Sequence, residues 1–171
     1  MRDPNSIFKW WKKHMEPKQY DSAPRAFRAQ LRRSSSSFEV LADARVVELA
    51  HDLKMVHDLP RLIALVQVLA AAKDHSNTSL SRKLGAKAGD VRAMSELRFR
   101  RLLRAEPGPE LETALIRALR MVDGTCDLGR LGADMIWWND DTRNRWCFEY
   151  YGKSVPEPLG MLDNDLEETT S

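Results

Sequence analysis

The sequence RLIALVQVLAAAK, from Arg61 to Lys73, is the most apolar stretch of the chain. Its apolar residues fall on most sides of an α-helix rather than on one stripe, which predicts a central and largely buried helix. Gln67 interrupts the stretch, which is much shorter than the roughly 20 residues that a membrane-spanning helix needs. We therefore expect this segment to form the middle of a helical core.

Most of the sequence on either side of this helix shows apolar residues at helical spacing. Before it, we expect a short helix marked by Ile7, Trp10 and Trp11, a helix from Pro24 to Arg33, and an element from Phe38 to about His57 with Leu41, Leu49, Leu53 and Val56 inward. After it, we expect a brief helix at Leu80 and Leu84 ended by Gly85, an arginine-rich helix stopped by Pro107 and Pro109, a helix from Glu110 to Val122, and two last helices through Trp138 and Tyr150. The predicted N-caps are Ser79 or Thr78, Ser95, Asp127 and Thr142.

The chain has 171 residues, of which 43% are hydrophobic and 30% charged, and this is typical of one soluble globular domain. No segment alternates polar and apolar residues, so we expect an all-α fold: a compact helical bundle of about eight or nine helices over residues 1–154, with no sheet. From Val155 onward the sequence holds two prolines and five acids but no base, and we interpret residues 155–171 as a disordered acidic tail.

The stretch SLSRKLGAKAGDVRAMSELRFRRLLRA, residues 79–105, carries eight Lys or Arg against two acids. On a helix, Phe99, Leu102 and Leu103 share one face, while Arg100, Arg101 and Arg104 lie on the opposite arc with Arg98 at its margin. Carboxylates four residues away, which would make ordinary intrahelical pairs, are nearly absent. Such a helix buries one side and presents the other to a negatively charged partner, and nucleic acid fits a row of guanidinium groups.

Positive charge is concentrated in two parts of the chain. The formal net charge is only +2, yet residues 1–33 and residues 79–104 each carry +6. If the two parts fold together, they form a basic patch. The candidate nucleic-acid-binding residues are Arg25, Arg28, Arg32, Arg33, Arg82, Lys83, Lys87, Arg98, Arg101, Arg104, Arg117 and Arg120.

The sequence contains no recognisable catalytic or metal-binding constellation. The four histidines and two cysteines lack metal-ligand spacing, and no glycine-rich phosphate loop is present. Asp140 and Asp141 could suggest a metal pair, but at a helix start such acids favour the helix dipole instead. We expect a protein without cofactor, metal or enzymatic activity. Because no signal peptide is recognisable and Cys126 and Cys147 are too few for a disulfide framework, we also expect a cytoplasmic protein with free thiols.

The tryptophans allow two interpretations. Trp137, Trp138 and Trp146 could stack on nucleic-acid bases, but their spacing fits the packing of a helix pair, which we favour. For Trp10 and Trp11, which stand beside several lysines, the sequence leaves both roles open.

The order of the motifs resembles the CasB family, the small subunit of the type I-E CRISPR surveillance complex, Cascade. The resemblance covers most of residues 7–153 and rests on four segments taken in order: LRR at Leu31–Arg33, SLSRKL at Ser79–Leu84, SELRFRRLLRA at Ser95–Ala105, and the D-L…W-W…R-x-x-W…Y-Y pattern from Asp127 to Tyr151. Residues 155–171 lie outside it.

This resemblance implies a compact all-α protein without catalysis or cofactor. It implies pairing with a second copy and with other Cascade subunits, no membrane association, and a basic surface that holds the target and displaced DNA strands and stabilises the R-loop, with any contact to the guide RNA secondary. By position in the motifs it implies roles for Arg32, Arg33, Arg82, Arg98 and Arg104, and across a small gap for Arg117 and Arg120; the other candidates enter on charge alone.

Two alternative functions remain. The chain could be a structural adaptor whose arginines contact acidic protein surfaces, which predicts no nucleic-acid affinity for the isolated chain. A nuclease or other hydrolase would instead show metal-dependent cleavage that substitution of Asp140 or Asp141 abolishes.

Overall fold

The computed structural model describes residues 3–155, and over this range the fold is helical. In chain order its elements are α1 (Pro4–His14), α2 (Ala23–Arg33), α3 (Ser37–Leu41), α4 (Ala44–Asp52), α5 (Leu59–Ala71), β1 (Asp74–His75), α6 (Leu80–Gly85), β2 (Lys87–Ala88), β3 (Val91–Arg92), α7 (Glu96–Arg104), α8 (Pro109–Met121), β4 (Thr125–Cys126), α9 (Leu128–Ile136) and α10 (Asp140–Tyr150). The predicted all-α class is confirmed, with ten helices among the described residues rather than eight or nine. The predicted tail falls, apart from Val155, outside the described residues.

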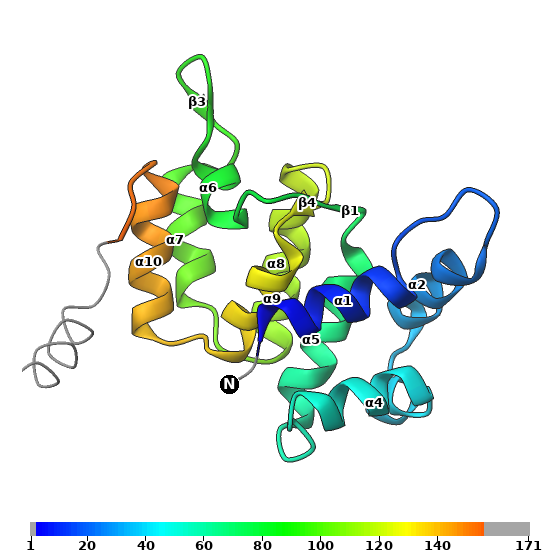
Figure 1. Ribbon diagram of the computed structural model, residues 1–171. Helices are drawn as coiled ribbons and strands as arrows, with labels where there is room; N and C mark the ends of the chain where they lie inside the picture. The colour runs from blue at the N-terminus through cyan, green and yellow to red at the C-terminus, as the bar shows by residue number, and fades with distance from the viewer. Residues whose placement is uncertain (1–2, 156–171) are drawn as a thin grey trace, which may run out of the picture.

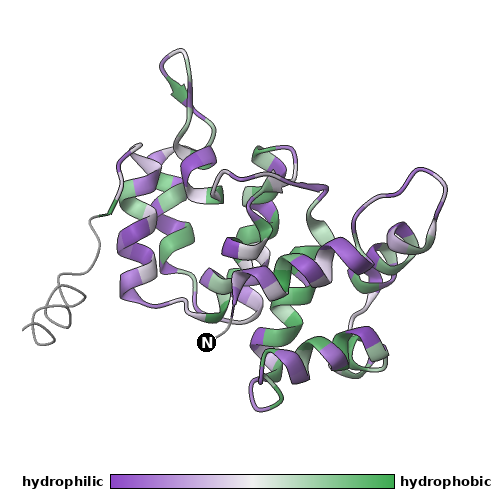
Figure 2. Ribbon diagram, in the orientation of Figure 1, coloured by the Kyte–Doolittle hydropathy of each residue, from purple (hydrophilic) through white to green (hydrophobic). Residues whose placement is uncertain are grey.

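The apolar segment quoted first forms α5, which lies in the middle of the molecule as predicted (Figure 1). Its side chains from Ala64 to Ala70 are all buried, and the helix packs against α2, α8 and α9. Figure 2 shows α5 mostly in the colour of hydrophobic residues, whereas α10 at the edge of the molecule is largely hydrophilic. The hydrophobic core is therefore built around one helix that has almost no polar side.

The first helix, α1, packs closely against α9, far along the sequence. Small residues on α9 permit this approach: a Cβ on Gly129 would lie 2.5 Å from the Pro4 carbonyl oxygen, and one on Gly132 would lie 2.7 Å from Ile7. Trp10 and Trp11 are both buried, and their indole N–H groups donate to the carbonyls of Arg45 and Leu69. Their role is thus core packing, which decides the question that the sequence left open.

The element predicted from Phe38 to about His57 is two helices, α3 and α4, separated by the N-cap Asp43. Val56, predicted to face inward, is 51% exposed. The chain leaves α4 at Leu53, and Lys54 takes a left-handed conformation with φ of 54°. This turn places Met55 in the core and leaves Val56 outside it.

Four strands of two residues each occur among the described residues. Strands β1 and β4 pair in parallel, and β2 and β3 form an antiparallel hairpin between α6 and α7, although the sequence analysis expected no sheet. The hairpin projects from the helical body (Figure 1), and Gly89, with φ of 65°, lies in the turn between its two strands. These ladders are too short to form a sheet that organises the core.

Candidate nucleic-acid interface

The arginine-rich helix that the sequence predicts is α7, and it begins at the predicted residue. Ser95 is the N-cap, and its hydroxyl accepts a hydrogen bond from the Arg98 amide. Phe99 and Leu102 are buried, and the Phe99 ring stacks on Tyr150 of α10 with ring centres 4.0 Å apart. The predicted division into an apolar and a basic side is therefore present, and the apolar side rests on an aromatic ring.

Side chains of α10, and of Trp138 just before it, form hydrogen bonds at both ends of α7. The Tyr150 hydroxyl donates to the Met94 carbonyl just before the helix, at 2.6 Å. At the other end, Arg143 Nε donates to the Leu103 carbonyl at 2.8 Å, and the Trp138 indole donates to the Ala105 carbonyl at 3.1 Å. Because α7 has only nine residues, these contacts fix its direction and with it the direction of its arginines.

A groove of about 820 Å³ runs between α7 and α8. Two arginines of each helix line it: Arg98 and Arg101 from α7, and Arg117 and Arg120 from α8. Its apolar lining consists of Met94, Leu102, Ala105, Ala114 and Met121, and the polar remainder of Glu110 and Thr113. Four cations and one carboxylate therefore face a hollow with an apolar surface.

The four arginines of this groove make no side-chain hydrogen bond or ion pair within residues 3–155. Arg100, on the same helix but outside the groove, has a partner, because its guanidinium lies 4.0 Å from the carboxylate of Glu96, one helical turn before it. Like charges held together without a partner repel one another, so the groove is suited to binding an anion.

The remaining candidates of residues 79–104 lie outside the groove. Arg104 is exposed, and Lys87 lies on the projecting hairpin. Arg82 donates to the Lys153 carbonyl at 3.4 Å, and Lys83 donates to the Thr125 carbonyl at 2.7 Å. Lys83 therefore ties α6 to β4.

The candidates on α2 lie at the opposite end of the molecule from α7 (Figure 1). Arg25, Arg32 and Arg33 are exposed, and Arg33 lines a separate hollow beside Phe38 and Glu39. The structure thus places the two basic parts of the sequence in two regions, and the α7–α8 groove contains no residue of α2.

Arg28, on the same helix, is buried, with 9% of its surface exposed. Its Nε donates to the Ala70 carbonyl at 3.1 Å, so the side chain ties α2 to α5. Burial, together with the neighbouring Arg32 and Arg25, lowers the pKa of this guanidinium. We therefore leave Arg28 out of the proposed interface.

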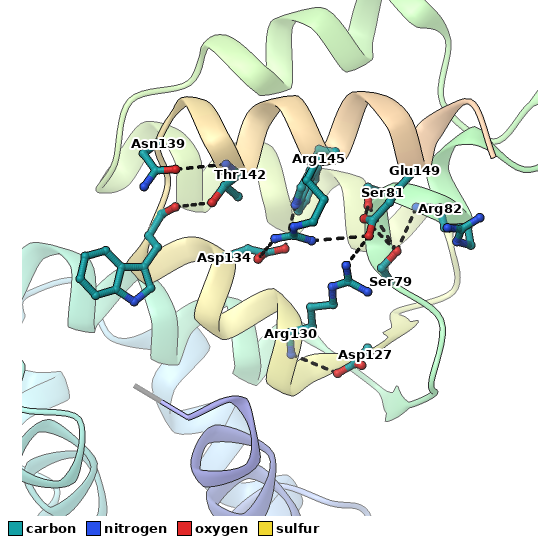
Figure 3. Close-up of polar contacts among 12 residues, drawn as sticks. Ser79, Ser81, Arg82, Asp127, Arg130, Asp134, Asn139, Thr142, Arg145 and Glu149 are labelled. Atoms are coloured by element: carbon teal, nitrogen blue, oxygen red, sulfur yellow. Dashed lines mark hydrogen bonds and ion pairs between the residues drawn. The ribbon is translucent and has the colours of Figure 1, made fainter. Parts of the chain in front are cut away.

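A buried polar network that sequence reasoning missed joins α6, α9 and α10 (Figure 3). Glu149, 4% exposed, accepts hydrogen bonds from Ser79, Ser81 and Arg130. Arg145 pairs with Asp134 and also lies 3.6 Å from Glu149. The signal for Arg145 and Glu149 was in the sequence, since the two residues stand four apart on one helix.

The same network includes Trp146, whose indole donates to Asp134 at 2.8 Å. Burial raises the pKa of Asp134, although Arg145 and Trp146 both act to lower it. Trp146 also packs edge-to-face against Trp138, so the preferred interpretation of core packing is correct for these two tryptophans. Trp137 differs, because it is 54% exposed.

The last helix begins one turn earlier than predicted. Asn139, not Thr142, is the N-cap of α10: its side chain accepts from the Thr142 amide, while the Thr142 hydroxyl donates to the Trp137 carbonyl (Figure 3). Asp140 and Asp141, expected at the helix start just before Thr142, occupy the first turn of α10 because the helix begins earlier. Residues 3–155 hold no cluster of three or more His, Cys, Asp or Glu side chains that could bind a metal.

The family to which the chain belongs follows from sequence comparison. The family model of the CRISPR-associated protein Cse2 matches residues 27–151, which include α7, α8 and α10. The chain belongs to the Cse2 family. CasB and Cse2 are two names for the same Cascade subunit, so the resemblance to the CasB family drawn from the sequence is confirmed.

Solved structures show that the Cse2 fold is shared. CasB from Thermus thermophilus is 24% identical to this chain and has a TM-score of 0.68, with 89% of this chain and 99% of that one covered. A chain in the crystal structure of E. coli Cascade bound to a PAM-containing dsDNA target is 20% identical, with a TM-score of 0.59 and 90% and 99% covered. The chain has no match among curated protein sequences. Among the described helices, none has the length and apolar character that crossing a membrane requires.

Proposed function

We propose that this Cse2-family chain is a non-catalytic subunit of a Cascade-type complex that binds the target and displaced DNA strands and stabilises the R-loop. The observation that carries the proposal is the α7–α8 groove, where Arg98, Arg101, Arg117 and Arg120 converge without partners among the described residues. The structural relative within E. coli Cascade, which is bound to DNA, supports the same assignment.

The mechanism follows from the chemistry of guanidinium groups. Each one can bind phosphate oxygens through two parallel N–H donors, and such a phosphate contact reads no base sequence. In RNA-guided recognition, base pairing supplies specificity and exchanges one duplex for another of similar stability. Phosphate contacts by the protein then tip this exchange toward the open R-loop. Other Cascade subunits and a second copy of the chain are the partners we propose around it, with contact to guide RNA secondary.

A salt titration of DNA binding tests the proposal. Arg98, Arg101, Arg117 and Arg120 are replaced by Gln, and binding of labelled single- and double-stranded DNA is followed by fluorescence anisotropy. Removal of one phosphate-binding arginine lowers the slope of log K against log salt by about 0.9 on duplex and about 0.7 on single strands. The matched control removes the same charge elsewhere, by replacing the exposed Lys9, Lys12, Lys13 and Lys18 with Gln.

We expect a shallower slope in the arginine variant and a smaller change in the lysine control. A second variant, with charge reversed at Arg98, Arg101 and Arg104, combines two groove arginines with one exposed arginine of α7 outside the groove, and it should also bind DNA more weakly with a shallower slope. An unchanged slope in the folded groove variant overturns the assignment. If the wild-type chain binds no nucleic acid even at low salt, the adaptor hypothesis replaces it.

A further inference from the structure

The α7–α8 groove has two chemical properties at once, because its arginines surround an apolar lining. Residues 156–171, which lie outside the described residues, have the complementary sequence PEPLGMLDNDLEETTS. Its acids are Glu157, Asp163, Asp165, Glu167 and Glu168, and its large apolar residues are Leu159, Met161, Leu162 and Leu166. No Lys or Arg is present in it.

We propose that residues 156–171 bind in the α7–α8 groove of the same molecule and compete there with DNA. The competition with DNA rests on the proposed function, whereas binding of the segment in the groove does not. The acidic segment regulates the groove by occupying it until a DNA strand displaces it.

The described chain ends close to the groove. Tyr150, near the end of α10, donates to the carbonyl of Met94, which lines the groove, and Lys153 accepts from Arg82 of α6. A chain spans about 3.3–3.6 Å per residue when extended, so the 16 residues from 156 to 171 reach on the order of 50 Å. The groove is within that reach, and a short tether gives an effective concentration in the millimolar range.

The charges match better at this groove than at the hollow beside α2. The α7–α8 groove presents four arginines and one glutamate, and carboxylates pair with guanidinium groups as phosphates do. The α2 hollow offers Arg33 together with Glu39, so its charges cancel, and it lies at the far end of the molecule. If the segment only improved solubility or repelled anions in solution, its acids alone would be enough. Binding in the groove also accounts for its leucines and Met161, because the apolar lining can bury them.

Binding of the segment can be measured without DNA. A nitroxide is attached to the full-length Ser171→Cys chain in a Cys147→Ser background, which leaves the buried Cys126 as the other thiol. We expect paramagnetic broadening of the amide signals of Arg98, Arg101, Arg117 and Arg120. The broadening should disappear when the five acids are replaced by Gln or Asn. Broadening confined to other helices, or absent throughout, overturns the proposal.

Competition is measured by a double-mutant cycle with labelled single-stranded DNA at low salt. If the segment fills the groove in about nine molecules of ten, neutralising its five acids tightens DNA binding about tenfold. In the background with the four groove arginines replaced by Gln, the same neutralisation should have no effect. An equal gain in both backgrounds overturns occupation of the groove, because the segment then acts by general repulsion.

The two experiments keep the two proposals separate. One result is broadening of α7 and α8 signals in a chain that binds no DNA, whether its five acids are present or neutralised. This result supports binding of the segment in the groove and overturns the DNA function. Tight DNA binding by the wild-type chain, with no broadening and no gain on neutralisation, supports the DNA function and overturns the docked segment.

Discussion

Two groups of arginines in this molecule have opposite surroundings. Arg98 and Arg101 of α7 face Arg117 and Arg120 of α8 across a groove that holds one carboxylate. On the other side of α10, Arg130 and Arg145 pair with Asp134 and Glu149 in a network that is largely buried. The residue type and the helical setting are the same in both places. An ion-paired carboxylate therefore separates arginines that hold the fold together from arginines available to a ligand.

The comparison also has an energetic side. Buried ion pairs recover their desolvation cost only while all their members are present, so removal of one member is severe. Substitution of an exposed arginine changes the free energy of unfolding little, because water solvates its charge in the folded protein. Substitutions in the two groups should thus differ in what they change: stability in the network, and ligand binding in the groove.

The largest effect is expected for Glu149→Ala, which leaves Arg130 and Arg145 without their shared carboxylate. The free energy of unfolding should fall by about 3 kcal/mol, at the low end for a buried pair that loses one member, because Arg130 is 42% exposed and Arg145 keeps Asp134. Urea denaturation followed by circular dichroism measures it. Glu110→Ala, which removes the carboxylate of the groove, is the control and should change stability by about 1 kcal/mol, because that carboxylate accepts one exposed hydrogen bond from the Glu106 amide. Equal effects of the two substitutions would abolish the distinction.

A smaller effect is expected at two serines that both cap helices. Ser79 caps α6 and also contacts Glu149, whereas Ser95 caps the arginine helix and is exposed. Ser95→Ala should cost about 1 kcal/mol, the usual value of an N-cap, and Ser79→Ala about 2 kcal/mol because its hydrogen bond to a buried carboxylate is removed as well. Midpoints of urea unfolding compare them. A larger loss for Ser95 would mean that the network adds nothing.

Near-zero effects on stability are expected for single Gln substitutions at Arg101 and Arg117. Each should shift the free energy of unfolding by no more than about 0.5 kcal/mol. Any increase in the free energy of unfolding should come from reduced repulsion between like charges, and it should become smaller as salt is added. Thermal melts at low and high salt measure both. A loss of several kcal/mol at either position would place that arginine with the structural group.

The smallest effect concerns the two thiols and leaves the fold unchanged. Burial raises the pKa of Cys126 to about 12, and the side chain is wholly covered, whereas Cys147 is partly exposed. Because the thiolate is the reactive form, Cys147 should react first with a thiol reagent in the native protein. Mass spectrometry after partial labelling identifies the modified residue. Prior modification of Cys126 would indicate that the segment around β4 opens readily.

The sequence predicts best what is decided by neighbouring residues. Ser79, Ser95 and Asp127 are N-caps as expected, because an N-cap bonds an amide two or three residues away. The error at Thr142 is also local, since Asn139 stands three residues earlier and its side chain takes the Thr142 amide. Asn139 and Thr142 are both suitable N-cap residues. The two acids directly after Asn139 indicated the earlier start, because acids are favoured in the first turn of a helix.

What the sequence could not supply depends on residues far apart in the chain. The charge pattern pointed to the arginines on α7 and the family resemblance to those on α8, but neither indicated that they lie across one groove. The burial of Arg28 depends on the Ala70 carbonyl, 42 residues away. The exposure of Val56 follows from a single left-handed residue, Lys54, in a segment whose helical pattern continues. Whether Arg25, Arg32 and Arg33 act together with the groove stays a prediction.

The contact between α1 and α9 also sets the order in which the chain can fold during synthesis. Pro4 meets Gly129, 125 positions later, and ribosomes add about 5–20 residues per second, so α1 waits about 6 to 25 s for its partner. During that interval Ile7, which Gly132 later contacts, lacks this cover. Helix α1 therefore leaves the ribosome well before its partner and is among the last elements to be secured, and it is where we expect chaperones to engage the nascent chain.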